Sequence, residues 1–206
     1  MGGRLVTIEG LDGTGKTTLG LALRDALAAR GVEAKLLREP GGVGLSERVR
    51  ALVKDPALAV ASRAEALLYA AARAQLVAER VRPLLEAGTW VLLDRFVDSS
   101  LAYQGGGRGL GVDAVAAINA FGTAGLAPDR TLLLRADPAT RAARRDTRGE
   151  AADRLELEDE AFFARVAEAY DALSAAEPER IRAVDAAAPP EAVLAAALAA
   201  LEDLLP

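Results

Sequence analysis

A glycine-rich segment near the start of the chain has the residue types and spacing of a phosphate-binding loop. Residues 10–17 read GLDGTGKT and fit the pattern G-x-x-x-x-G-K-[ST]. Glycines let the backbone turn so that successive N–H groups converge on phosphate oxygens. Lys16 can reach the β- and γ-phosphates, and the hydroxyl of Thr17 can ligate Mg²⁺. We predict a nucleoside triphosphate site formed by Gly10, Leu11, Asp12, Gly13, Thr14, Gly15, Lys16, Thr17 and Thr18.

A carboxylate at the end of an apolar run fits the same chemistry. The run Trp90–Asp94 is followed at once by Arg95. Asp94 could be only a helix cap or a turn residue, but beside a phosphate loop we expect it to hold the water shell of Mg²⁺. Arg95 is costly to bury without a partner, so we expect it to face a phosphate or a carboxylate.

The elements that must position these residues follow from the hydrophobic pattern. Five short apolar runs, typical of buried parallel strands, alternate with longer helical stretches. The predicted strands are Leu5–Glu9, Ala34–Arg38, Trp90–Asp94, Thr131–Arg135 and Ile181–Asp185. The predicted helices are Lys16–Arg30, ended by Gly31, Arg63–Ala87, divided or kinked at Pro83 and ended by Gly88, Val112–Thr123, Pro138–Arg145, Asp159–Ala176 and Pro190–Leu204. This alternation predicts an α/β fold in one domain, residues 1–206, with a five-stranded parallel sheet and helices on both faces.

The composition excludes several classes of chemistry. The 206 residues are 51% hydrophobic and 27% charged, and they include no cysteine and no histidine. The chain therefore has no disulfide framework, thiolate nucleophile, histidine proton shuttle or histidine-based metal site. The net charge of −5 argues against a nucleic-acid partner, and no stretch resembles a signal peptide or a membrane span. We expect a cytoplasmic protein that uses carboxylates, lysine, arginine, hydroxyls and a hard cation.

The phosphate loop alone leaves three classes of protein open. A GTPase switch needs an N-K-x-D run, but Asn119, the chain's one asparagine, is followed by Ala120. An ATPase motor usually has a longer chain. A small phosphotransferase fits the length and predicts further arginines and a mobile lid. Residues 141–154 are rich in arginine and contain Gly149 as a candidate hinge. A solvated helix face is the alternative interpretation of that segment.

These motifs together resemble those of bacterial thymidylate kinases along nearly the whole chain. The resemblance rests on EGLDGTGKTT at residues 9–18, REPGG at 38–42, LYAAAR at 68–73, DRF at 94–96, AYQGGGRG at 102–109 and DR at 153–154. It implies a P-loop nucleoside monophosphate kinase fold that usually forms a homodimer. It also implies transfer of the γ-phosphoryl group of ATP to dTMP, with Mg²⁺, which gives dTDP and ADP in the synthesis of dTTP.

The same resemblance implies an arginine-bearing lid. Members of the family whose P-loop holds no basic residue carry the catalytic arginine in the lid. None of the four residues between Gly10 and Gly15 is basic. We therefore expect a mobile lid at about residues 141–154, with Arg148 as the first choice for the catalytic arginine and Arg145 as the second.

Roles around the acceptor phosphate and sugar are also implied by the resemblance. Asp12 matches the loop carboxylate that accepts a hydrogen bond from the deoxyribose 3′-hydroxyl, and Arg95 matches the arginine that binds the dTMP phosphate. The turn that contains Glu39 and Pro40 lines the acceptor site. Arg48 is expected to contact a phosphate from the next helix, although a surface ion pair is its alternative interpretation.

Recognition of the base and sugar is expected from a third group of residues that the resemblance identifies. Tyr69 lies where an aromatic ring stacks on thymine. Arg73, one helical turn later, lies where an arginine donates to a thymine carbonyl. Ser100 and Gln104 fall near the base-reading positions, and Tyr103 resembles the ring that closes over the sugar and disfavours a 2′-hydroxyl. Both tyrosines could instead be core aromatics.

Two other functions stay open on the sequence. One is a kinase for another nucleoside or deoxynucleoside monophosphate, and the other is a nucleotide-dependent switch without enzyme activity. A preference for a purine acceptor would contradict the roles expected of Tyr69 and Arg73. Failure to turn over ATP with any monophosphate would favour the switch.

Overall fold

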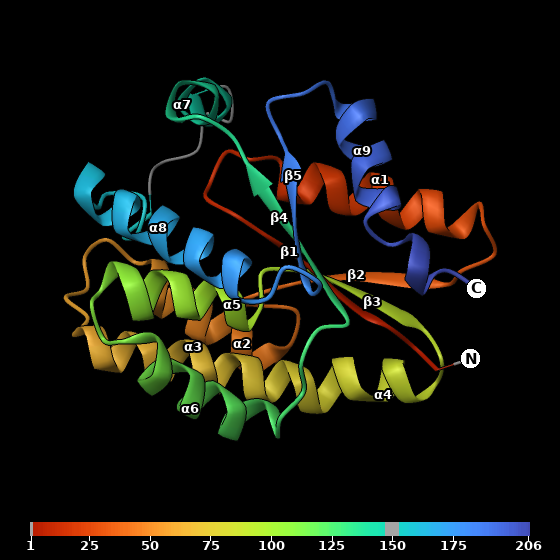
Figure 1. Ribbon diagram of the computed structural model, residues 1–206. Coiled ribbons are helices and arrows are strands. Elements are labelled where there is room, and N and C mark those ends of the chain that lie inside the picture. The colour runs from red at the N-terminus through yellow and green to blue at the C-terminus, as the bar shows by residue number, and fades with distance from the viewer. Residues whose placement is uncertain (1, 147–152) are drawn as a thin grey trace.

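Five parallel strands form one sheet in the part of the chain that the structure, a computed structural model, describes, residues 2–146 and 153–206. In chain order the strands are β1 (Leu5–Glu9), β2 (Ala34–Arg38), β3 (Trp90–Asp94), β4 (Arg130–Arg135) and β5 (Ile181–Asp185). Their order in the sheet is β2-β3-β1-β4-β5, so β1 lies at the centre (Figure 1). Because Ile8 pairs with Asp94, the segments that follow β1 and β3 begin next to each other at the carboxyl edge.

Successive side chains of a strand point to opposite faces of the sheet, and both faces carry apolar residues. Helices therefore cover both faces. One face, with Val6, Leu92 and Leu132, packs against α1 (Lys16–Ala28) and α9 (Pro190–Ala199). The opposite face packs against α3 (Ser62–Leu76), the π-helices η1 (Val77–Val81) and η2 (Leu101–Gly107), and α8 (Glu160–Ala176). Figure 1 shows these two groups of helices on opposite sides of the strands.

Further helices lie around this framework. α2 and α6 both pack against α3, and Figure 1 shows α7 beyond the end of β4. None of the described helices is long and apolar enough to cross a bilayer. The bounds of these helices are α2 (Gly44–Lys54), α4 (Arg82–Glu86), α5 (Val97–Ser100), α6 (Val112–Thr123), α7 (Pro138–Asp146) and the 3₁₀ helix η3 (Glu202–Leu204).

The predicted fold class is confirmed, and the strand bounds agree except that β4 begins one residue earlier, at Arg130. The helix predicted over residues 63–87 is divided into α3, η1 and α4, and its π-helical turn ends directly before Arg82 and Pro83. Proline has no N–H to donate within a helix, which explains the break at this place. Gly31 and Gly88 end their helices as predicted, with left-handed φ of 78° and 84°.

The sequence pattern does not predict η2, because three consecutive glycines have low helix propensity. Close packing explains these glycines. A Cβ on Gly107 would lie 2.6 Å from Cε2 of Phe162, and one on Gly106 would lie 2.5 Å from Cβ of Ala169. The glycines therefore let α8 approach η2 directly, and this contact fixes η2 against the sheet.

Gly107→Ala should lower the free energy of unfolding by about 1–3 kcal/mol, the usual cost of overpacking a core. Urea denaturation measures this change. Gly44→Ala is the matched control, because no atom lies within 4 Å of its added Cβ and it should be neutral or slightly stabilising. A Gly107→Ala protein as stable as the parent would show that α8 can move away from η2 at no cost.

Candidate active site

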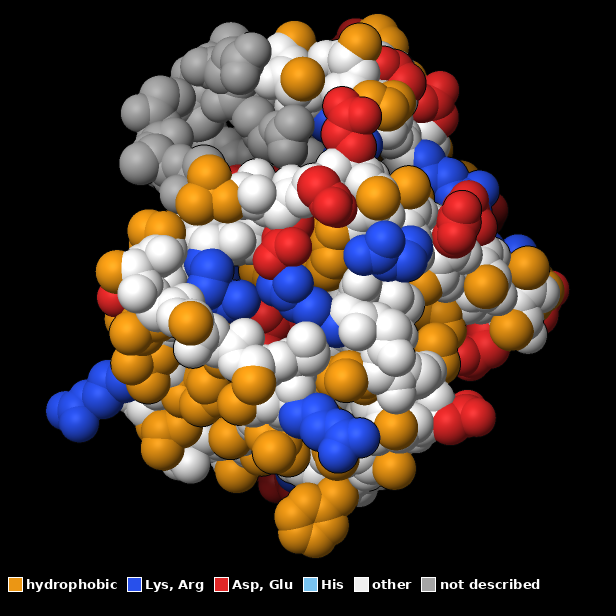
Figure 2. All heavy atoms as spheres, turned by 90° about the vertical axis from the view of Figure 1, so that its left-hand side faces the viewer, with side chains coloured by type: hydrophobic (Ala, Val, Ile, Leu, Met, Phe, Trp, Pro, Cys, Tyr) orange, Lys and Arg blue, Asp and Glu red, His pale blue; other side chains and the backbone are white. Residues whose placement is uncertain are grey.

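A cavity of about 920 Å³ opens at the carboxyl edge of the sheet. The loop after β1 and residues of α2, α3 and η2 form its walls. Figure 2 shows basic and acidic side chains gathered near the centre of one face of the molecule. The cavity brings together most of the sequence-predicted site residues, namely Asp12, Gly13, Gly15, Lys16, Thr17, Thr18, Glu39, Pro40, Tyr69, Arg73, Asp94, Arg95, Ser100, Tyr103 and Gln104.

The glycine-rich loop turns as its sequence requires. Gly13 and Gly15 have left-handed φ of 85° and 89°, and Gly15 caps the N-terminus of α1. A Cβ on Gly13 would lie 2.5 Å from the carbonyl oxygen of Arg141, so the loop also lies against α7. The remaining predicted loop residues face a smaller cavity of about 190 Å³ on the other side of the loop; they are Gly10, Leu11 and Thr14.

Lys16 folds back over this loop. Its Nζ donates to the carbonyl oxygens of Gly10 and Leu11 at 3.1 and 3.0 Å, and it lies 3.7 Å from Oδ1 of Asp12. Burial, and secondarily the nearby guanidinium of Arg95, lower the pKa of Lys16 to about 8, although neighbouring carboxylates act in the opposite direction. A bound phosphate would therefore stabilise the charged form of Lys16 more than it would stabilise a solvated lysine.

Thr17 and Asp94 form an oxygen pair beside Lys16. Thr17 Oγ1 donates to Oδ2 of Asp94 at 2.7 Å. Mg²⁺ prefers oxygen ligands, keeps several waters and commonly takes one or two protein oxygens together with substrate phosphates. No group of three or more acidic side chains suited to a metal occurs in residues 2–146 and 153–206. The pair therefore fits a Mg²⁺ that is shared with a bound triphosphate.

Arg95 follows β3 in a strained backbone conformation. Its φ is 72°, and a left-handed conformation costs a residue with a side chain about 1–2 kcal/mol. Two hydrogen bonds to β1 hold the turn, because Arg95 N donates to Ile8 O at 3.0 Å and Phe96 N donates to Oε1 of Glu9 at 2.7 Å. The turn directs the guanidinium into the cavity rather than along the strand.

Glu9 supports this turn from a fully buried position. Its Oε2 accepts from Ser99 Oγ at 2.5 Å and from the hydroxyl of Tyr170 at 2.9 Å. Burial, together with the nearby carboxylate of Asp98, raises the pKa of Glu9. Ser99 in turn accepts a hydrogen bond from Arg95 at 3.1 Å, so a chain of polar contacts joins β1 to the Arg95 side chain.

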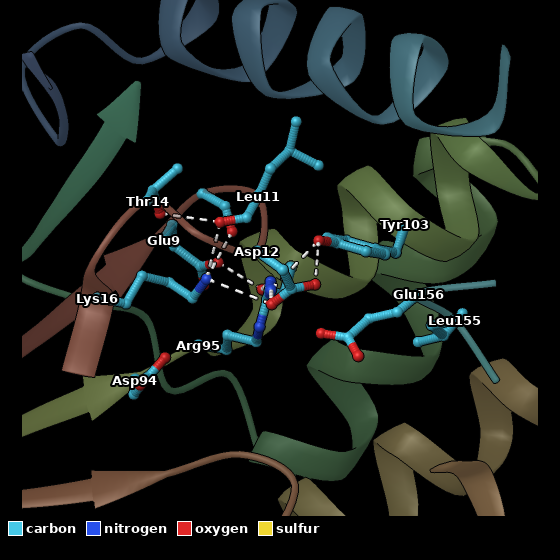
Figure 3. Close-up of polar contacts among 12 residues, drawn as sticks. Glu9, Leu11, Asp12, Thr14, Lys16, Asp94, Arg95, Tyr103, Leu155 and Glu156 are labelled. Carbon is cyan, nitrogen blue, oxygen red and sulfur yellow. Dashed lines mark hydrogen bonds and ion pairs between the residues drawn. The ribbon is translucent and has the colours of Figure 1, made fainter. Parts of the chain in front are cut away.

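The guanidinium of Arg95 lies between the loop and η2 (Figure 3). Its Nη2 donates to Oδ1 of Asp12 at 2.7 Å and to the hydroxyl of Tyr103 at 3.2 Å, and its Cζ lies 5.0 Å from the centre of the Tyr103 ring. Burial disfavours its charge and is the largest single effect, but Asp12, Tyr103, Tyr170 and Asp94 together outweigh it, and the pKa of Arg95 is raised well above its ordinary value. The expectation that Arg95 faces a carboxylate is thus confirmed.

Arg73 is held as tightly, and it is only 2% exposed. It donates to Oε2 of Glu39 at 2.6 Å, to Oγ of Ser100 at 2.9 Å, to the carbonyl oxygen of Phe96 at 2.8 Å and to Oδ1 of Asn119. Burial raises the pKa of Glu39 to about 7, although Arg73 opposes that shift. Arg73 is therefore a fixed donor at the wall of the cavity.

The two tyrosines combine packing with access to the cavity. Tyr69 lines the cavity and also packs against Val49 and Val53 of α2. Tyr103 meets Phe162 edge-on, with ring centres 6.1 Å apart, while its hydroxyl faces Arg95. Each tyrosine therefore belongs to a hydrophobic cluster as well as to the site.

One predicted site residue, Arg48, does not reach the cavity. Arg48 lies exposed on the outer side of α2 and is not among the residues that line the cavity. Arg50 lines it instead, and its Nη1 donates to the carbonyl oxygen of Pro40 at 2.9 Å. The buried residues Ser46 and Val53 lie on the same side of α2 as Arg50, so helical periodicity could have identified the arginine that faces the cavity. Arg48 lies about half a helical turn away from it, and its phosphate contact stays a prediction.

Known proteins of similar sequence cover the whole chain. The family profile described as thymidylate kinase matches residues 8–197. A thymidylate kinase of Rhizorhabdus wittichii is 49% identical over 208 residues, which is 100% of both chains. One of Alkalilimnicola ehrlichii is 49% identical over 197 residues, which covers 94% of this chain and 90% of that protein.

The chain belongs to the thymidylate kinase family.

A solved structure agrees with this membership. The crystal structure of thymidylate kinase from Ehrlichia chaffeensis superposes with a TM-score of 0.79 at 27% identity and covers 98% of this chain and 100% of that one. The resemblance inferred from the sequence motifs is thereby confirmed, together with the P-loop nucleoside monophosphate kinase fold.

The two candidates for the lid arginine lie at the edge of the part of the chain that the structure describes. Arg148 lies outside the described residues, and Arg145 is in α7. Residues 153 and 154 are anchored to the end of α2, since Arg154 N donates to the carbonyl oxygen of Lys54 at 3.1 Å and Lys54 pairs with Asp153 at 2.7 Å.

Several residues that line or support the cavity of this family member were not identified from the sequence. Glu9 and Ser99 lie behind Arg95. In the sequence, Glu9 is only a polar residue at the end of a strand, and Ser99 is only a serine in a short helix. Arg38 lines the cavity and donates to Glu47. Glu156 also lines the cavity, and Figure 3 shows its carboxylate pointing toward the side chains of Asp12 and Arg95. The partners of Glu9 are distant in sequence, so spacing alone gives no signal for Glu9 or Ser99.

The depressed pKa of Lys16 predicts a rise in stability with pH. An unfolded lysine keeps its proton to a pKa of about 10.4, so the unfolded chain binds more protons between pH 8 and that value, and stability rises there. The unfolding free energy of the nucleotide-free parent, relative to Lys16→Met, should rise by at most about 3 kcal/mol between pH 8 and pH 10. Urea titrations at several pH values measure this difference. Parallel curves for the two proteins would contradict the lowered pKa.

Proposed function

We propose that this protein transfers the γ-phosphoryl group of ATP to dTMP, which gives dTDP and ADP. The observation that supports this most is that one cavity of about 920 Å³ joins the glycine-rich loop to the corner formed by Tyr69, Arg73 and Gln104. Arg95 lies between these two ends. The arrangement suits two phosphorylated substrates held end to end.

The loop end of the cavity suits the triphosphate. Backbone N–H groups around Gly13 and Gly15, with the N-terminus of α1, would bind its β- and γ-phosphates. Lys16 would leave the carbonyl oxygens of the loop and donate to those phosphates instead. Thr17 and Asp94 would hold Mg²⁺, which supplies charge neutralisation for the phosphates when bound.

The acceptor end suits a monophosphate. Arg95 would hold the acceptor phosphate in line with the γ-phosphate, and Asp12 would then be released to accept from the sugar 3′-hydroxyl. Tyr103 would lie against the sugar, Tyr69 would stack on the base, and Arg73 would donate to a base carbonyl. Phosphate oxygens are already ionised near neutral pH, so the transfer needs alignment and charge neutralisation rather than a strong base.

A coupled assay of ADP release with MgATP and four acceptors tests this function. The acceptors are dTMP, dUMP, dGMP and dCMP, each at matched concentrations. We expect dTMP to give the highest kcat/KM. A purine acceptor used as well as dTMP would favour a kinase for another monophosphate. ATP turnover with none of the four would favour a nucleotide-dependent switch and reject the proposal.

Arg50, rather than Arg48, is expected to donate to the phosphate of dTMP. Arg50→Ala should therefore raise the KM for dTMP by about tenfold or more, since a hydrogen bond to a charged group is worth about 1.5–3 kcal/mol. The KM for ATP should change little, because Arg50 lines the side of the cavity next to Pro40. Arg48→Ala is the matched control on the same helix, and its constants should equal those of the parent. Steady-state kinetics decide between the two arginines. Loss of dTMP affinity in Arg48→Ala alone would restore the sequence-based assignment.

We also propose that residues 141–154 act as the lid and that Arg148 supplies positive charge to the transition state. An arginine that acts only there contributes about 10³–10⁵ in rate. Arg148→Ala should therefore lower kcat by at least about a thousandfold with little change in the KM for dTMP. Single-turnover measurements separate chemistry from product release. If Arg148→Ala keeps near-normal turnover and Arg145→Ala does not, the second choice is correct.

A homodimer through α2, α3 and α6 completes the proposal. Phe121 of α6 is 91% exposed and Leu67 of α3 is 57% exposed, and these helices are neighbours. Figure 2 shows hydrophobic side chains concentrated in the lower half of the face that it presents. Sedimentation equilibrium tests the assembly.

The substrates are nucleotides of the cell interior, so we place the activity in the cytoplasm.

A further inference from the structure

Glu65 lies behind the base-reading corner of the cavity, on the same side of α3 as Tyr69 and Arg73. Its side chain is fully buried, at 0% exposure, and it does not line the cavity. Its carboxylate accepts from three side chains. Oε1 accepts from Nε2 of Gln104 at 2.9 Å and from Arg108 at 3.2 Å, and Oε2 accepts from Arg108 at 3.0 Å and from Arg154 at 2.6 Å.

These contacts keep Glu65 ionised. Burial alone would raise its pKa, but the hydrogen bonds from Arg108, Gln104 and Arg154 outweigh burial, and the pKa of Glu65 is lowered. An ionised carboxylate has acceptor atoms only. Glu65 therefore accepts hydrogen bonds throughout the neutral pH range and donates none.

This property decides which way the amide of Gln104 faces. The nitrogen and oxygen of an amide cannot be told apart by shape, so their assignment depends on the partner. A carboxylate tolerates only the Nε2 side, because an oxygen facing it would be repelled and left without a donor. Among the described residues, nothing donates to Oε1 of Gln104, which leaves this acceptor for a ligand in the cavity.

We propose that Glu65 is a positioning residue that makes Gln104 an acceptor toward the base and thereby selects a 3-NH-4-oxo pyrimidine over a 4-amino pyrimidine. The inference rests on the proposed function, since it concerns the acceptor base. Arg73 lies at the same corner, where its hydrogen bonds to Glu39, Ser100, Asn119 and Phe96 occupy four of its five N–H groups. Within the described residues this leaves one N–H of Nη2 as a donor toward the cavity. A donor from Arg73 and an acceptor from Gln104 match the carbonyl and N3–H of thymine. They oppose the amino group and the unprotonated N3 of cytosine.

The ratio of kcat/KM for dTMP to that for dCMP, with MgATP, tests the proposal. The amide that Glu65→Gln introduces can donate or accept, so the amide of Gln104 is free to adopt either orientation. The ratio should fall at least tenfold, mostly through a higher KM for dTMP and a lower one for dCMP. A ratio equal to that of the parent would overturn the proposal. Failure of the parent to phosphorylate dTMP would reject the proposed function instead, whatever the variants do.

Two further variants separate positioning from general stability. Glu158→Gln is the matched control, because Glu158 pairs with the same Arg108 at 2.6 Å, whereas the side chain of Gln104 donates to Glu65. Its ratio should stay within about twofold of the parent's. In a Gln104→Leu background, Glu65→Gln should change the ratio no further, since the residue through which it acts is gone. An equal loss in Glu158→Gln, or a further loss in the double variant, would overturn the proposal.

Side-chain amide exchange in the nucleotide-free parent keeps the proposal testable even if Glu65→Gln fails to fold. The chain has only two glutamines, and Gln75, which donates to Glu79 at the surface, is the internal reference. NMR should show one amide proton of Gln104 exchanging at least tenfold more slowly than those of Gln75, with the assignment made from Gln104→Leu. Exchange of both Gln104 protons as fast as those of Gln75 would overturn the proposal.

Discussion

The partly buried guanidinium of Arg95 needs a charged partner, and this need governs the geometry of the whole site. Because β1 and β3 are neighbours, the residue after Asp94 reaches the loop after Glu9, and Arg95 can meet Asp12 at 2.7 Å. Hydrogen bonds from Arg95 N and Phe96 N to residues of β1 hold its left-handed backbone in place. Through its hydrogen bonds to Asp12 and to the hydroxyl of Tyr103, Arg95 therefore links the glycine-rich loop to η2 across the cavity.

The same principle extends along the cavity wall. Lys16 lies over the loop carbonyls and near Asp12, and Arg73 is paired with Glu39. Isolated charges are costly to bury, whereas paired ones are tolerated. In the nucleotide-free protein each of these cations already has a protein partner. Phosphate oxygens can replace some of those partners without requiring the cations to move far, so the site is preorganised for anions before they arrive.

How much of this the sequence could predict depends on whether the signal is local. The strands and the glycine-rich loop are local patterns, and their bounds agree with the structure almost residue for residue. The π-helix η2 is not, because its glycines are explained only by the approach of α8, more than 50 residues later. Arg50 was missed because the bounds of α2, and so its inward face, were not drawn from the sequence. Glu65 was missed because its three partners come from two other parts of the chain.

Three buried glutamates show how a chain without histidine orients its functional groups. Glu9, Glu39 and Glu65 are all nearly or fully buried, yet their pKa values move in different directions. Glu9 accepts from neutral donors, and Glu39 accepts from Arg73 through one oxygen, so burial prevails and the pKa of each is raised. Glu65 accepts from two arginines and an amide, so its pKa is lowered. The number of cationic donors thus decides whether a buried carboxylate stays ionised. Since Glu65 is the one of the three whose pKa is lowered, it is the one suited to impose a fixed hydrogen-bond polarity on a neighbouring amide.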